Sequence, residues 1–111
     1  MTLETLMSAL PPGASIAVPA VRGISGGYTS DLLSDVMANS KSGDALITIQ
    51  AHRNTVAVAS LVGIAAVVIC NAREIPPEMA QAARDEGIGI ASTSASQFEV
   101  SGLLWSALRS A

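Results

Sequence analysis

Residues 47–54 read Ile-Thr-Ile-Gln-Ala-His-Arg-Asn, and the residues that follow, TVAVASLVGIAAVVIC (55–70), carry no charge. Ile47 and Ile49 alternate with polar residues, which is the pattern of a β-strand with one buried face. Asn54 is a good N-cap, so we expect a helix over 54–61 that Gly63 ends. Residues 65–70 are almost continuously apolar, as in a strand covered on both faces. We expect the rest of the chain to pack around this strand–helix–strand segment.

The other helices and strands follow from apolar spacing and from capping and turn residues. We expect helices over 3–10, 31–39, 77–86 and 97–108, and strands over 15–18, 45–50 and 88–91. Three glycines within 21–29 indicate a loop or a bulged strand there. Ser30 is the expected N-cap of the second helix, and Ser96 with Glu99 forms a capping box for the last one. This alternation predicts a single layered α/β/α domain over residues 1–111, with a mostly parallel sheet.

The composition limits the classes of function. Hydrophobic residues make up 50% of the chain and charged residues 14%, against a usual charged share of about 25%. A small protein with so little charge is expected to bury part of its surface in an oligomer. The net charge is −3 without a basic cluster, which argues against a nucleic-acid partner. A single cysteine, Cys70, excludes an internal disulfide and a multi-cysteine metal site.

The uncharged run 54–72 raises the question of a membrane helix, because about 18 apolar residues can span a bilayer. Gly63 stands in the middle of this run, and the β-branched residues gather in its second half. Both features favour a buried helix followed by a buried strand. The N-terminal stretch is amphipathic and lacks the basic residues that begin a signal peptide. We therefore expect a cytoplasmic protein with no membrane segment.

Polar side chains follow the expected strands, and the ligands of open α/β sheets bind beyond the carboxyl ends of strands. The candidate ligand-binding residues are Ser30, Asp31, Thr48, Gln50, His52, Asn54, Ser92 and Thr93. Asn71 and Arg73 follow a further strand. Hydrogen-bonding side chains with few charges suit a neutral or nucleotide-like ligand. The alternative is that serine, threonine and asparagine at these positions only cap helices.

Little in the sequence indicates catalysis or a metal site. His52 is the only histidine, and no serine or cysteine nucleophile pattern accompanies it. Asp31 and Asp35 lie four residues apart, but two carboxylates are too few ligands for a convincing cation site. The glycines of residues 23–27 match neither the dinucleotide fingerprint nor a P-loop. We expect a protein that is not an enzyme and that has neither a metal nor a cofactor.

The expected helix 54–61 has no charged face. A helix that is apolar all round is covered on more than one side. We expect the second cover to be another subunit, which predicts a homodimer through the Asn54–Leu61 helix. Burial beneath the terminal helices is the alternative.

Three segments and two short pairs carry a resemblance to a known family. They are Asp31-Leu32-Leu33-Ser34-Asp35-Val36-Met37-Ala38, Ile47-Thr48-Ile49-Gln50, Val56-Ala57-Val58-Ala59-Ser60, Gly87-Ile88 and Ser92-Thr93. With them the chain resembles the DRTGG domain family from about Leu3 to Leu108, although the Asp-Arg-Thr-Gly-Gly string itself is absent. The resemblance implies a fold like the N-terminal domain of HPr kinase. It also implies functional associations. DRTGG domains accompany nucleotide-sensing CBS domains in pyrophosphatases, and stand-alone members are often encoded near iron-only hydrogenase subunits.

Two functional hypotheses follow. The first is a non-enzymatic, homodimeric regulatory domain that binds a small ligand resembling an adenine nucleotide. The second is an accessory or assembly protein of a redox enzyme such as an iron-only hydrogenase, with the apolar helix as its docking face and no small-molecule ligand.

Overall fold

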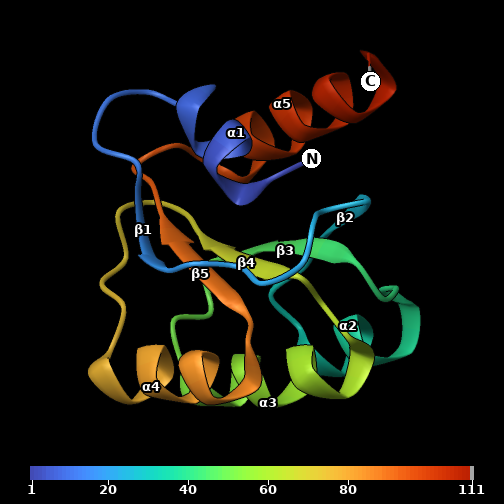
Figure 1. The fold of residues 1–111 in the computed structure, drawn as a ribbon, viewed down its shortest axis with the longest axis vertical. Helices are drawn as coiled ribbons and strands as arrows, with labels where there is room; N and C mark the ends of the chain where they lie inside the picture. Colours follow the sequence, from blue (N-terminus) through green and yellow to red (C-terminus); the bar gives the residue numbers. More distant parts are fainter. Residues whose placement is uncertain (111) are drawn as a thin grey trace.

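The computed structural model describes residues 1–110, and its strands form one sheet between two layers of helices (Figure 1). The strand order is β1-β5-β4-β3-β2, in which β2 to β5 run parallel and β1 pairs with β5 antiparallel. The strands are β1 (Ser15–Val18), β2 (Gly26–Thr29), β3 (Asp44–Thr48), β4 (Ala66–Ile69) and β5 (Gly89–Ser92). The predicted α/β/α architecture with a mostly parallel sheet is confirmed.

The helices divide between the two faces of the sheet (Figure 1). They are α1 (Leu3–Ser8), α2 (Leu33–Asn39), α3 (Arg53–Val62), α4 (Pro77–Glu86) and α5 (Gln97–Ser110). The terminal helices α1 and α5 cover one face, and α3 lies between α2 and α4 on the other. The alternative that α3 is buried beneath the terminal helices is therefore wrong.

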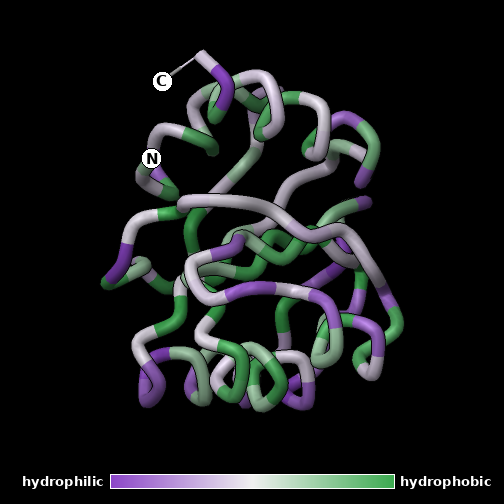
Figure 2. The backbone as a smooth tube through the Cα atoms, turned by 90° about the vertical axis from the view of Figure 1, so that its right-hand side faces the viewer, coloured by the Kyte–Doolittle hydropathy of each residue, from purple (hydrophilic) through white to green (hydrophobic). Residues whose placement is uncertain are grey.

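Alternation along the strands divides the core into two apolar clusters. Ile47 and Val68 face α1 and α5, whereas Leu46 and Val67 face α2, α3 and α4. All four side chains are at most 1% exposed. Fully burying one such side chain contributes about 1.5–3 kcal/mol. The hydrophobic colour in Figure 2 accordingly runs through the middle of the molecule, between the helix layers.

Helix α3 is covered on its inner side only. Its buried residues are Thr55, Val56, Val58 and Ala59. Ala57, Ser60 and Leu61 are exposed, and Leu61 is the large apolar side chain among them, at 76% exposure. The homodimer through this helix stays a prediction.

Two predicted element boundaries are wrong at their polar ends. The strand predicted over 45–50 spans Asp44–Thr48, because the Ile49 N–H donates to the Asp31 carboxylate (2.9 Å) instead of continuing the ladder. Helix α2 starts at Leu33, with Leu32 as its N-cap. Ser30 is therefore not the N-cap, and its Oγ accepts the Leu32 N–H (3.2 Å) in the turn before the helix.

Residues 21–29, predicted as a loop or a bulged strand, contain an irregular segment followed by a regular edge strand, β2, which has no bulge. Other local predictions are confirmed. The capping box of α5 forms: the Ser96 N–H donates to Glu99 Oε1 (3.1 Å), and the Glu99 N–H donates to Ser96 Oγ (3.2 Å). Gly63 ends α3 with a left-handed φ of 91°. Within residues 1–110, no helix is long and apolar enough to span a membrane.

Candidate functional site

Asp31 is the centre of a hydrogen-bonded group at the carboxyl edge of the sheet, which we call the Asp31 cluster (Asp31, Thr48, Gln50 and Gln97). Its Oδ1 accepts hydrogen bonds from Thr48 Oγ1 (2.8 Å), the Ile49 N–H (2.9 Å) and Gln97 Nε2 (3.0 Å). Gln50 Nε2 donates to the Asp31 backbone carbonyl (3.0 Å). The cluster thus joins the end of β2, the end of β3 and the start of α5.

The surroundings of Asp31 hold it in its charged form. Burial by itself raises its pKa, but the hydrogen bonds from Ile49, Thr48 and Gln97 and the positive charge of Arg73 lower it more. The net result is a pKa below the ordinary value of 3.8. Because these donors come from the protein itself, most of the hydrogen-bonding capacity of Asp31 Oδ1 is already used.

His52 and Asn54 begin α3. The N-cap is His52, whose Nδ1 accepts the Asn54 N–H at 3.0 Å. The prediction that Asn54 is the N-cap is therefore wrong. Asn54 lies inside the helix and is exposed to solvent. Sequence reasoning chose Asn54 because asparagine caps helices far more often than histidine does.

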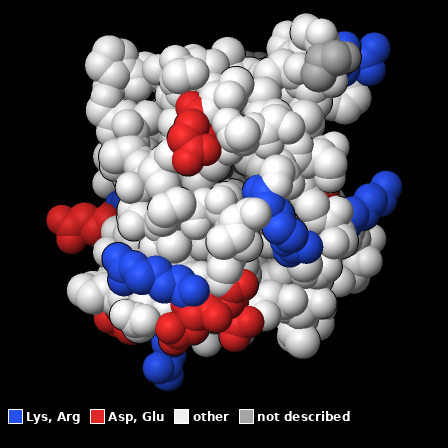
Figure 3. Space-filling model, viewed as in Figure 1, with Lys and Arg blue, Asp and Glu red and all other residues white. Residues whose placement is uncertain are grey.

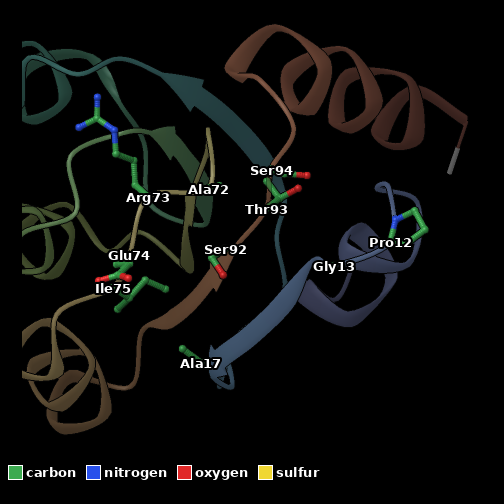
Figure 4. A pocket seen from close by; sticks show the side chains of 10 residues that line it. All are labelled: Pro12, Gly13, Ala17, Ala72, Arg73, Glu74, Ile75, Ser92, Thr93 and Ser94. Carbon is green, nitrogen blue, oxygen red and sulfur yellow. The ribbon is translucent and has the colours of Figure 1, made fainter.

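Ser92 and Thr93 lie at the end of β5, beside a cavity of about 690 Å³. We call it the Arg73 cavity, and its lining is shown in Figure 4. The lining residues are Pro12, Gly13, Ala17, Ala72, Arg73, Glu74, Ile75, Ser92, Thr93 and Ser94. Thr93 is 2% exposed, and its Oγ1 accepts the Ala95 N–H (3.1 Å), so its hydroxyl serves the loop. Ser92, Ser94 and Arg73 remain accessible.

The loop after β4 that borders this cavity is strained. Asn71 (φ 61°) and Ala72 (φ 56°) both have left-handed backbones, which cost alanine more than asparagine or glycine. The loop is held by hydrogen bonds from the Asn71 N–H to the Ala95 carbonyl (3.0 Å) and from the Ala72 N–H to the Thr93 carbonyl (2.9 Å). Strain of this kind costs about 1–3 kcal/mol and gathers at ligand-binding and active sites. It also fixes where Arg73 leaves the backbone.

Whether the titratable groups at this edge are reactive or bind a metal depends on their surroundings, and Cys70 is the thiol closest to the site. Burial, with a smaller contribution from Asp31, raises the pKa of Cys70 to about 11, so its thiol is a poor nucleophile near neutral pH. Across residues 1–110, no group of three histidine, cysteine, aspartate or glutamate side chains is placed to hold a metal ion. Every buried polar side-chain atom of the described residues has a hydrogen-bond partner.

The structure therefore divides the predicted site into three places. Ser30, Asp31, Thr48 and Gln50 lie in or beside the Asp31 cluster. His52 and Asn54 lie at the start of α3, and Ser92 and Thr93 at the Arg73 cavity.

Two parts of the cavity are missing from the predicted ligand-binding set. Arg73 follows a strand on the same edge, which is a usable signal. Pro12, Gly13 and Ala17 line the cavity because β1 pairs antiparallel with β5, and no spacing in the sequence predicts that pairing.

No protein-family model matches this chain, and no curated protein sequence matches it. Among solved structures, the chain is similar to the CBS and DRTGG domains of the regulatory region of Clostridium perfringens pyrophosphatase, complexed with its activator diadenosine tetraphosphate. The TM-score is 0.72 at 13% sequence identity. The match covers 93% of this chain and 45% of that one, so the chain spans less than half the length of its structural neighbour. This likeness establishes the fold.

Proposed function

We propose that the protein is a non-enzymatic regulatory domain that binds a small anionic ligand, of the adenine-nucleotide class, in the Arg73 cavity. The observation that carries the proposal is the cavity itself. Its volume of about 690 Å³ lies within the range of about 300–1,000 Å³ that is usual for ligand pockets. It also lies at the carboxyl ends of parallel strands, where α/β sheets bind their ligands.

The lining of the cavity supports a nucleotide. The Arg73 guanidinium is a bidentate donor for phosphate oxygens, and because its side chain extends away from Ser92 and Ser94 in Figure 4, we place the phosphate at the rim of the cavity. The Ser92 and Ser94 hydroxyls add hydrogen-bonding groups to the lining. The Glu74 carboxylate lies in the same lining and can accept hydrogen bonds from ribose hydroxyls or an exocyclic amine. A ligand with separate anionic and hydrogen-bond-donating ends matches this pair better than a simple anion.

The structural neighbour supports regulation rather than catalysis. It belongs to a regulatory region and was solved with a nucleotide activator. The unreactive Cys70 thiol and the use of His52 as a helix cap also argue against nucleophilic chemistry in this chain. A regulatory domain needs only to bind its ligand and to present a changed surface to a partner.

Isothermal titration calorimetry with AMP, ATP and diadenosine tetraphosphate tests the proposal. We expect at least one of them to bind, and Arg73→Gln to weaken that binding at least about tenfold, because a charged hydrogen bond is worth about 1.5–3 kcal/mol. Arg84→Gln, an exposed cation in the last turn of α4, is the matched control and should leave the affinity unchanged. Equal weakening by both variants would mean that only net charge attracts the nucleotide.

A second candidate function is docking to a redox enzyme such as an iron-only hydrogenase, without a small ligand. The observation that favours a protein partner is the exposure of two aromatic side chains of α5, Phe98 (87%) and Trp105 (65%). Absence of heat with every nucleotide, together with comigration of the protein with a hydrogenase in gel filtration, would favour this second function over the first.

A further inference from the structure

The two edges of the sheet differ in how they are protected. β1 carries a register shift between Ile16 and Val18 and is followed by Pro19, and both features discourage pairing with another strand. β2 is Gly-Gly-Tyr-Thr, with no proline, charge or bulge. The Ser30 N–H donates to the Ile47 carbonyl (3.3 Å), so by alternation the backbone groups of Gly27 and Thr29 face away from β3. β2 is therefore an unprotected edge.

Helix α5 lies directly over this edge and runs antiparallel to β2. Thr29 Oγ1 is 2.7 Å from Ser101 Oγ, and a Cβ on Gly27 would come within 2.6 Å of the Leu104 side chain. Figure 1 shows α5 passing over the sheet toward β2. Trp105 borders hollows on both sides of β2, one of which also contains Asn39 and Lys41. Its ring thus overhangs the open edge.

An apolar cavity of about 460 Å³ opens between α5 and β2. Its apolar walls come from Ile47, Leu104, Trp105 and Leu108, and its floor from Gly26 and Gly27. Phe98, at 87% exposure, is the most exposed large apolar side chain of the described residues, and it lies two turns before Trp105 on the same side of α5. One helix therefore carries both an unburied aromatic ring and part of an unfilled apolar cavity.

We propose that a second copy of this chain docks here, pairing β2 with its own mate in antiparallel orientation. Hydrogen bonding between Gly27 and the partner's Thr29, and the reverse, places the two-fold axis at Tyr28. In that register Ser25 lies opposite the partner's Asp31, whose carboxylate accepts a hydrogen bond from the partner's Gln97 at 3.0 Å. The partner's Phe98 then lies at the cavity formed by Gly26, Leu104 and Leu108, so each subunit fills the cavity of the other.

The charges on α5 agree with this arrangement. Two helices related by a perpendicular two-fold axis run antiparallel, which brings Glu99 near the start of one helix toward Arg109 near the end of the other. Opposite charges and opposite helix ends then meet twice. On the face drawn in Figure 3, most charged side chains lie over the lower half of the molecule, and few lie over the upper part, where Figure 1 places α1 and α5. The product is a continuous sheet with β2 at its centre rather than at its edge.

Sedimentation equilibrium on three proteins tests the proposal. The parent should have twice the monomer mass of 11.2 kDa at micromolar concentration. Phe98→Glu should raise the dimer dissociation constant at least about tenfold, as expected for an anchoring aromatic residue. Its monomer should stay folded, because Phe98 is exposed and an acidic residue suits the first turn of a helix. Leu61→Glu, at a side chain that is also largely exposed (76%) but lies on α3, should leave the dimer intact.

A monomeric parent would overturn the proposal. So would dissociation by Leu61→Glu but not by Phe98→Glu, since that result would place the interface on α3.

The register has its own test: Tyr28→Cys places two thiols across the axis in a pair with about 4.5 Å between Cα atoms, which a disulfide can bridge. Oxidation with copper phenanthroline should cross-link Tyr28→Cys and leave Leu61→Cys uncross-linked. Cross-linking of Leu61→Cys alone would contradict the proposed register and face.

Discussion

The Asp31 cluster and the Arg73 cavity lie on the same carboxyl edge of the sheet, but they use their polar atoms in different ways. Asp31 Oδ1 accepts three hydrogen bonds from within the protein. At the Arg73 cavity the Ser92 hydroxyl lies 3.3 Å from Ser15 Oγ, whereas Ser94 and Arg73 are exposed to solvent. A polar strand end can accept a ligand only where the protein has not already satisfied its hydrogen-bonding groups, and the two regions differ in that respect.

The difference has a physical origin in the ends of the strands. After β2 and β3 the chain turns so that backbone and side-chain donors converge on one carboxylate, and a charge-assisted hydrogen bond is among the stronger kinds. After β4 the chain enters a left-handed turn at Asn71 and Ala72, whose N–H groups bond to the loop after β5. That turn directs the backbone bonds inward and leaves the side chains beyond it free.

Removing the Asp31 carboxylate should have the largest effect on stability. Asp31→Ala leaves Thr48 and the Ile49 N–H without their acceptor, and we expect a loss of about 2–3 kcal/mol in the free energy of unfolding. Urea denaturation measures it. Asp85→Ala is the control, because Asp85 is exposed and accepts a hydrogen bond from Gln81 of its own helix. It should change stability by less than about 0.5 kcal/mol. Similar losses of stability in Asp31→Ala and Asp85→Ala would show that Asp31 contributes no more to the fold than an ordinary surface residue.

Thr48 should show a smaller effect that depends on Asp31. Its side chain is fully buried, and its Oγ1 donates to Asp31 and accepts the Gln50 N–H (3.1 Å). Thr48→Val keeps the shape and removes both bonds, at an expected cost of about 1–2 kcal/mol. In a double-mutant cycle with Asp31→Ala, the coupling should reach at least about 0.5 kcal/mol. Strict additivity would show that the two residues do not act together.

The loss of stability at acid pH should depend on Asp31 more than on Arg73, and this difference should be smaller than the effects described above. The pKa of Asp31 is lower in the folded protein than its ordinary value of 3.8, so the unfolded chain binds the proton more readily. The stabilisation from Asp31 is therefore complete well above pH 3.8 and is lost as the pH falls through the folded pKa. Asp31→Asn should flatten the acid limb of a stability–pH profile, and Arg73→Gln should leave most of it. An unchanged acid limb in Asp31→Asn would assign the acid sensitivity to other carboxylates.

The smallest effect on stability is expected at the Arg73 cavity. Ser94→Ala removes a hydroxyl that is exposed to solvent at the cavity. The change in unfolding free energy should therefore stay within about 0.5 kcal/mol. Thermal denaturation without ligand measures it. A loss comparable to that of Thr48→Val would show that the cavity wall, like the Asp31 cluster, serves the fold.

The sequence predicts the layers of this fold better than it predicts the site. Apolar spacing, with capping and turn residues, placed every helix and every strand except β2 to within a few residues, because the burial of Leu46, Val67 and their neighbours follows from the apolar pattern of the chain. Which polar residues would pair with one another could not be read in the same way. Asp31 meets Gln97 across 66 positions of sequence, and residues 12–17 reach β5 only through the strand order. His52 capped α3 because of the local backbone, against the usual preference for asparagine.

The central claim is that the Asp31 cluster stabilises the fold and the Arg73 cavity binds the ligand. The most direct test is thermal melting of the parent, Arg73→Gln and Asp31→Asn, with and without millimolar ATP or diadenosine tetraphosphate. Ligand at about 100 times its dissociation constant adds about 2.7 kcal/mol to stability. We predict that Arg73→Gln starts within a few degrees of the parent melting temperature, because Arg73 makes only the last of the four contributions that lower the Asp31 pKa, and loses most of the ligand-induced rise. Asp31→Asn should start lower and keep the rise. A full rise in Arg73→Gln, a rise lost only in Asp31→Asn, or no rise in the parent would contradict the account.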